Sequence, residues 1–222
     1  MTNVIKAERK GGIIVHTLHN GEQTKYAAIR GGISWPLVSE NIPAYYCIVG
    51  EEYVPASRYE GQSALRGKLH LICEYDAPDI YLSLSVFFSR LTDDITHLLC
   101  NDFYGITETY KGEDYQGYVE ALQNSTYANK VSVSLQEAPW AEKPDLGIQH
   151  IMTWQKKGLL DIPTDSILYD QIKQLQPGDL KQIETLQAVN AFRFVISAFE
   201  KYRPSGLSGF VPNRTGRPYR FR

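Results

Sequence analysis

The sequence predicts an α/β fold: a mixed β-sheet flanked by helices, with an N-terminal β-hairpin. Short apolar runs bounded by turn residues recur along the chain and are typical of buried strands. Segments with the 3.6-residue periodicity of amphipathic helices lie between them. After an antiparallel start the strands and helices alternate. This order favours one sheet with helices on its faces.

The composition is that of an ordinary globular protein. The 222 residues are 43% hydrophobic and 22% charged, with a net charge of −2 and a pI near 6.2. The chain is therefore long enough for a sizeable core. It has no global basic surplus that would predict strong non-specific binding to nucleic acid.

The cysteines and the hydropathy pattern indicate the cellular compartment in which the protein is expected. Cys47, Cys73 and Cys100 lie in apolar runs without a C-x-x-C pair, so we interpret them as buried hydrophobic residues in a reducing environment. The sequence shows no signal-peptide pattern and no apolar run of about 20 residues. We expect a cytoplasmic protein without a membrane partner.

The first half of the chain predicts strands with one helix among them. Gly11-Gly12 and Gly31-Gly32 are interpreted as turns, and Asn20-Gly21 joins a hairpin. Asp93-Asp94 is interpreted as a solvated turn. The expected elements are a hairpin over 13–18 and 23–29, strands over 45–53 and 69–75, a helix over 80–91 and a strand over 96–105.

The second half predicts mainly helices. We expect helices over 115–122, 148–158, 166–176 and 180–202, and strands over 129–135 and 159–163. Lys156-Lys157-Gly158 is a cationic helix end followed by a glycine cap. The expected organisation is a hairpin extension over 1–43, a domain over 44–203 and an arginine-rich, irregular tail over 204–222.

Two apolar runs end in carboxylates. The run from His97 to Cys100 leads to Asp102, and the strand from Tyr45 ends in Glu51-Glu52. A carboxylate at the end of a buried strand costs free energy unless something pairs with it, and a metal ion is one such partner. The alternatives are a turn aspartate bonded to backbone amides and a charged strand exit.

The order of these elements resembles the ribonuclease-H-like fold, and more narrowly the nuclease domain of the large terminase subunit of tailed bacteriophages. Three segments carry most of the resemblance: 46–52 as first strand with an acid tip, 98–105 as the second acid-bearing strand, and the long helix starting near Glu184. Further matches are Lys130-Val131-Ser132-Val133 and the helix–strand–helix run over 148–175. The match covers about residues 44–202 in order and spacing.

The resemblance implies a two-metal endonuclease that acts on DNA during phage packaging. In such a site two divalent ions stabilise the attacking and leaving oxygens of a phosphodiester, and carboxylates hold Mg²⁺ or Mn²⁺. Carried over to this chain, the catalytic residues are Glu51, Glu52, Asp102 and Glu184, with Asp179 as an alternative to Glu184. Glu51, Asp102 and Glu184 are the expected metal ligands. The implied partners are DNA and a packaging ATPase or other phage protein.

The chain departs from the family pattern at two places. The family has Asp where Glu51-Glu52 stands, and Gln187 is neutral in the stretch that matches the family's acidic helix start. The chain also has no phosphate-binding loop of the G-x-x-x-x-G-K-[ST] type. An alternative therefore stays open: a catalytically inactive ribonuclease-H-like module that acts as a structural or binding protein in a phage or prophage assembly. The tail arginines fit either phosphate contacts or a solubilising end.

Overall fold

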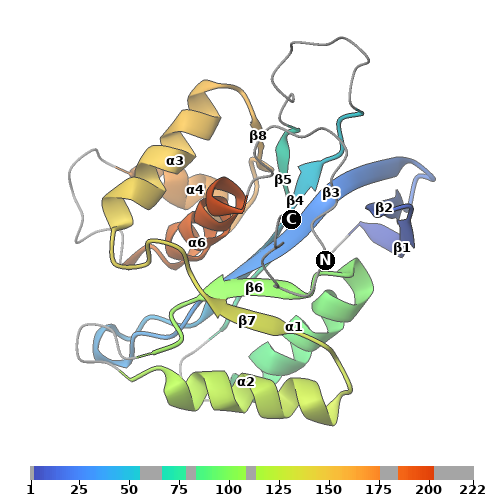
Figure 1. The fold of residues 1–222 in the computed structure, drawn as a ribbon. Helices are drawn as coiled ribbons and strands as arrows, with labels where there is room; N and C mark the ends of the chain where they lie inside the picture. Colours follow the sequence, from blue (N-terminus) through green and yellow to red (C-terminus); the bar gives the residue numbers. More distant parts are fainter. Residues whose placement is uncertain (1–2, 56–66, 79–83, 109–113, 176–184, 203–222) are drawn as a thin grey trace, which may run out of the picture.

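The computed structural model describes residues 3–55, 67–78, 84–108, 114–175 and 185–202. In these ranges an eight-stranded mixed sheet carries helices on both faces (Figure 1). The strands are β1 (Val4–Lys10), β2 (Ile13–Leu18), β3 (Gln23–Ser34), β4 (Tyr45–Glu52), β5 (Leu69–Asp76), β6 (Asp102–Gly105), β7 (Ser134–Glu137) and β8 (Leu160–Asp161). The helices are α1 (Leu84–Leu98), α2 (Gln116–Ala128), α3 (Pro144–Lys156), α4 (Ile167–Gln174) and α6 (Gln187–Lys201), with a short 3₁₀ turn η1 (Val38–Glu40).

The long strand β3 organises the sheet. Along one side it pairs antiparallel with β4, and along the other with β2 near its start and with β6 near its end. β6 runs parallel to β3, and β7 runs parallel to β6. The order β5-β4-β3-β6-β7, with three antiparallel strands followed by two parallel ones, is that of a ribonuclease-H-like sheet. This confirms the predicted fold class, including the N-terminal hairpin.

Gly31 and Gly32 lie inside β3, so their interpretation as a turn is wrong. A Cβ atom at Gly31 would lie 2.3 Å from the ring of Phe103 on β6. A Cβ at Gly32, on the other face, would lie 2.1 Å from the carbonyl oxygen of Ala191 on α6. The two glycines let a ring approach one face of the strand and a helix backbone approach the other.

Two hydrophobic clusters fill the two faces of the sheet. α1 and α2 cover one face, and α3, α4 and α6 cover the other (Figure 1). α6 is buried at every position from Gln187 to Phe199, because it lies between the sheet and the helices α3 and α4. A helix enclosed in this way needs partners for each of its polar side chains.

Asp94 is buried, so its interpretation as part of a solvated turn is wrong. It lies on α1 and is 3% exposed. Its Oδ2 accepts hydrogen bonds from the Tyr46 hydroxyl (2.7 Å) and the Cys73 thiol (3.1 Å), and it pairs with Arg90 at 3.2 Å. The carboxylate therefore joins α1 to two strands of the sheet.

The strand expected over 96–105 is correct only at its end. α1 continues to Leu98, Leu99 has a left-handed φ of 58°, and β6 begins at Asp102. A short apolar run can be the end of a buried helix or a buried strand, and its pattern alone does not separate the two. Asp102 thus lies at the start of a strand, not at its end.

Most of the other predicted elements are present with shifted ends. β1, which pairs with β2, was not expected. α2 runs on to Ala128, α3 begins earlier at Pro144, and Ser166 caps α4 by accepting from the Tyr169 amide at 3.0 Å. The tail over 204–222 lies outside the described residues, and the domain boundaries stay a prediction. In the described ranges, no helix has the length and hydrophobicity needed to span a bilayer.

Replacing Gly32 by valine is expected to destabilise the protein by about 3 kcal/mol or more, because the added side chain collides with the α6 backbone. Gly117→Ala is the control: a Cβ there meets nothing within 4 Å, and alanine favours the first turn of α2. Urea denaturation of both variants tests this. Equal stability of Gly32→Val and the native chain would contradict the close contact.

The three thiols are expected to be unreactive in the folded protein. Burial raises the pKa of Cys47, Cys73 and Cys100, and Asp94 adds to the effect at Cys73. A thiol reagent at pH 8 should therefore label none of them quickly in the native state and all of them after denaturation. Fast native labelling of one thiol would contradict its burial in the folded protein.

Candidate functional site

The carboxyl ends of β3 and β6 form the topological switch point of the sheet. These parallel neighbours lead into connections that leave in different directions, to β4 and to α2. Ligands of open α/β sheets bind outside such an edge. The start of α6 lies at the same place, because Asn190 contacts Ser34, the last residue of β3. We therefore take this edge as the candidate site.

A buried polar network occupies the switch point. The Asn190 amide donates to Ser34 Oγ at 2.9 Å, and its Oδ1 accepts from Arg193 Nε at 2.7 Å. Arg193 is 2% exposed; it also donates to the Ala141 carbonyl at 3.1 Å and stacks over the Phe194 ring at 4.3 Å. The network holds a guanidinium, an amide and a hydroxyl at the end of the central strand.

Gln187 adds a second amide to this edge. It lies three residues before Asn190, so both side chains project from one face of the first turns of α6. Gln187 is 4% exposed, and in the described part of the chain both of its amide atoms lack a hydrogen-bond partner. A buried amide without partners costs free energy, so a partner outside the described residues is expected.

The amino end of α6 is already capped. The Oε1 of Gln171 on α4 accepts from the amides of Ala188 (2.8 Å) and Val189 (3.3 Å). On β5, Glu74 likewise accepts from the amides of Ile167 (2.8 Å) and Leu168 (3.1 Å) at the start of α4. These helix ends use protein acceptors in place of an external anion.

The switch-point side chains do not fit a magnesium or manganese centre. Such ions take carboxylate and other oxygen ligands, whereas this network has a hydroxyl, two amides and a guanidinium. Arg193 already places a positive charge in the buried network. Over the described ranges, no group of three or more His, Cys, Asp and Glu side chains is arranged to hold a metal ion.

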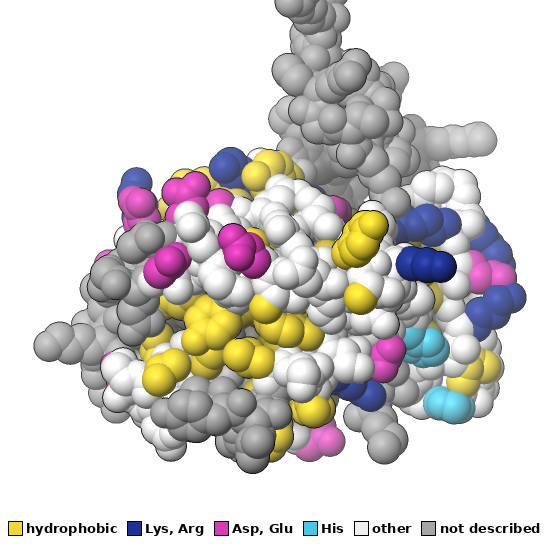
Figure 2. Space-filling view, turned by 90° about the horizontal axis from the view of Figure 1, so that it is seen from below, with side chains coloured by type: hydrophobic (Ala, Val, Ile, Leu, Met, Phe, Trp, Pro, Cys, Tyr) yellow, Lys and Arg dark blue, Asp and Glu magenta, His cyan; other side chains and the backbone are white. Residues whose placement is uncertain are grey.

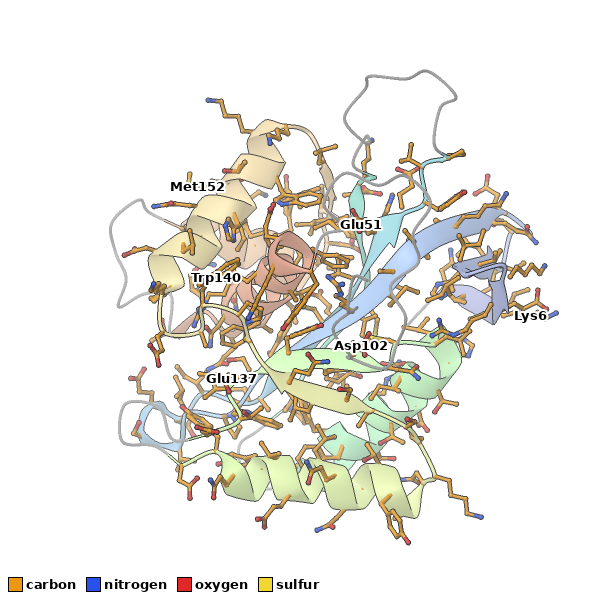
Figure 3. All side chains as sticks on the ribbon, in the orientation of Figure 1. Lys6, Glu51, Asp102, Glu137, Trp140 and Met152 are labelled. Atoms are coloured by element: carbon orange, nitrogen blue, oxygen red, sulfur yellow. The ribbon has the colours of Figure 1, made fainter. Side chains whose placement is uncertain are left out.

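The predicted acids Glu51 and Asp102 lie near the opposite edge of the sheet (Figure 3). Their strands, β4 and β6, flank β3, so about 10 Å of sheet separates them. Arg30 on β3 lies between them on the same face, since Asp102 pairs with Arg30 and Glu51 pairs with Ala28, two residues before. Arg30 donates to the Ala198 carbonyl at 2.9 Å and lies over Phe199.

Glu52 points to the other face from Glu51. Its carboxylate lies 3.9 Å from His70 Nε2, and it accepts from the Lys68 amide at 3.4 Å. Asp161 on β8 holds the other ring nitrogen of His70 at 2.7 Å. The two adjacent glutamates therefore lie on opposite faces of the sheet and contact different residues, as expected for the alternating side chains of a strand.

Glu184 and Asp179 lie outside the described residues. The structure therefore brings Glu51 and Asp102 to one face, separates Glu52 from them, and leaves the third carboxylate untested. The assignment of these four residues as a catalytic site stays a prediction.

Sequence reasoning missed Ser34, Asn190 and Arg193. Polar residues within the long apolar helix, at the i, i+3 and i+6 positions of 187, 190 and 193, were the available signal. Such spacing places them close together around the helix. Their partner at the end of β3 could be found only once the strand was placed beside α6.

The sequence matches no protein-family model and no curated protein. Several solved structures are similar in fold, among them the following three. The large terminase nuclease from thermophilic phage G20c, with bound zinc, shares 12% identity over 90% of this chain and 94% of that chain, with a TM-score of 0.47. The fowlpox virus Holliday junction resolvase shares 11% over 78% and 98% (TM-score 0.43), and Thermus thermophilus RuvC 12% over 79% and 97% (TM-score 0.41). Because these identities and TM-scores are low, the fold assignment rests on the order of the strands. The similarities support no conclusion about the activity of this chain.

Asn190→Ala is expected to destabilise the fold by about 2–4 kcal/mol, because it removes the acceptor of the buried Arg193 Nε and the donor to Ser34. Asn190→Asp keeps an acceptor for Arg193 and should lose less. Asn129→Ala, which removes an exposed bond to the Ser125 carbonyl, is the control and should cost below about 1 kcal/mol. Thermal and urea unfolding measure all three, and similar losses for Asn190→Ala and Asn129→Ala would contradict the role of the network.

Proposed function

We propose that this chain is a ribonuclease-H-like module that binds its partners without hydrolysing phosphodiesters. The observation that carries the proposal is the buried Ser34–Asn190–Arg193 network at the switch point. Hydrolysis by two metals needs carboxylates that converge on both ions. At this edge a guanidinium and neutral groups take up the space between β3 and α6.

The location of the predicted acids supports the same reading. Glu51 and Asp102 lie near the edge away from the start of α6, with the Arg30 strand between them. The positive charge of Arg30 on the same face offsets part of the negative charge of the two carboxylates. The alternative of a packaging endonuclease rests on the order of the elements.

DNA and another protein of a phage assembly are the partners we propose, in keeping with the resemblance in the sequence. Exposed lysines lie along the edge that carries the starts of the parallel strands, among them Lys25, Lys130 and Lys157. Cations of this kind can contact phosphates without cleaving them. A packaging ATPase stays a further predicted partner.

A nicking assay tests the absence of hydrolysis. Supercoiled plasmid is incubated with Mn²⁺ or Mg²⁺ and either the native chain or Asp102→Ala. The expected result is no metal-dependent nicking by either protein, and no Mn²⁺ binding by calorimetry at sub-millimolar concentration. Nicking by the native chain that Asp102→Ala abolishes would overturn the proposal and restore the endonuclease hypothesis. Native-like unfolding of the variant, followed by circular dichroism, is the control for folding.

A further inference from the structure

The charges of the molecule are sorted between the two edges of the sheet. Where the parallel strands end and α3 and α4 begin, exposed acidic side chains predominate, and we name six of them the acidic edge. Its members are Asp76, Glu108, Glu137, Glu142, Asp145 and Asp170. Among the described residues of these segments, Lys143 and Lys173 are exposed bases.

The opposite edge carries most of the exposed bases. They come from the N-terminal hairpin and from the carboxyl ends of α2, α3 and α6, as Lys10, Lys130, Lys156 and Lys201 exemplify. Seen from below, acidic side chains lie mainly on the left of the molecule and basic ones mainly on the right, where the hairpin lies (Figure 2). A segment rich in arginine is therefore attracted to one edge and repelled by the other.

Two further observations indicate that the acidic edge takes a ligand. Gln187 lies in the first turn of α6 at this edge, buried, with both amide atoms unpartnered in the described part of the chain. A polypeptide offers the donor and the acceptor that such an amide requires. The edge is also crowded with negative charge: burial and then Glu74 raise the pKa of Asp76.

The chain itself contains a segment of matching charge. Residues 203–222 include five arginines (203, 214, 217, 220 and 222) and no acidic residue. The segment follows Tyr202 at the far end of α6, which is about 22 Å long. Twenty residues span up to about 65 Å when extended, so the segment can return to the acidic edge.

We propose that the acidic edge is a docking surface for the arginine-rich segment 203–222 of the same polypeptide. Each exposed ion pair contributes little free energy, so the docking is weak, reversible and sensitive to salt. Because the segment is covalently linked to α6, its effective concentration at the acidic edge is high, and this compensates for the weak individual ion pairs. The inference stands on the charge pattern and is independent of whether the chain hydrolyses DNA.

Photo-crosslinking in the full chain tests the proposal. The crosslinking residue p-benzoylphenylalanine replaces Phe221, and mass spectrometry maps its attachment at low and at high salt. The expected crosslinks attach to residues within 137–145 or near Asp170. Their yield is expected to fall several-fold at high salt and in the double variant Glu142→Gln/Asp145→Asn. The matched control, Glu22→Gln/Asp93→Asn, removes two exposed acids near the opposite edge and should leave the attachment unchanged.

Three results would overturn the docking: attachment to the hairpin strands, attachment that Glu142→Gln/Asp145→Asn does not reduce, and attachment between two copies. Denaturing electrophoresis separates crosslinks within a copy from those between copies. Circular dichroism confirms that each variant is folded. None of these readouts measures DNA cleavage, so failure here is distinguishable from failure of the proposed function.

Discussion

The contact between Gly32 and the backbone of Ala191 is the constraint on which the rest of the structure depends. Any side chain at Gly32 would enter the space of the α6 carbonyl, so only glycine lets the helix lie this close to β3. Because α6 is buried from Gln187 to Phe199, its position fixes α3 and α4 above it and the switch point at its amino end. On the other face Gly31 admits the Phe103 ring and brings β6 into register.

That close packing also explains the chemistry of the switch point. Polar side chains at the start of an enclosed helix must find partners inside the protein, and Asn190 finds Ser34 and Arg193. Arg193 is buried yet bonded to an amide and a carbonyl, with Gly147 of α3 packed against its stem. The same strand order that organises a nuclease can thus enclose a site of different chemistry, since fold and function are separable. The acids that remain exposed lie around this site, on the loops and helix starts.

Comparison of particular elements shows what local patterns could predict. The hairpin turn at Asn20-Gly21, the start of α4 beside Ser166 and the cationic end of α3 depend on neighbouring residues, and the structure contains all three. The run from His97 to Cys100 was assigned to a strand although it ends a helix, because an apolar run of four residues has no distinguishing period. Asp94 was taken as solvated because its partners, Tyr46 and Cys73, come from distant strands. Glu51 and Glu52 were treated as one acid tip, yet the pleat sends them to opposite faces.

By itself, the sequence determined the alternation of strands and helices, the buried cysteines and the group of five arginines in the last twenty residues. These features depend on composition and on contacts between near neighbours. Only the tertiary structure decided that β3 is the central strand, that a bulge between Tyr26 and Ala28 adjusts its pairing with β4, and that Ser34 meets Asn190. Strand order, register and the partner of a buried polar group are set by packing between residues far apart in the sequence, such as Arg30 with Asp102 and Ser34 with Asn190, which no local pattern encodes.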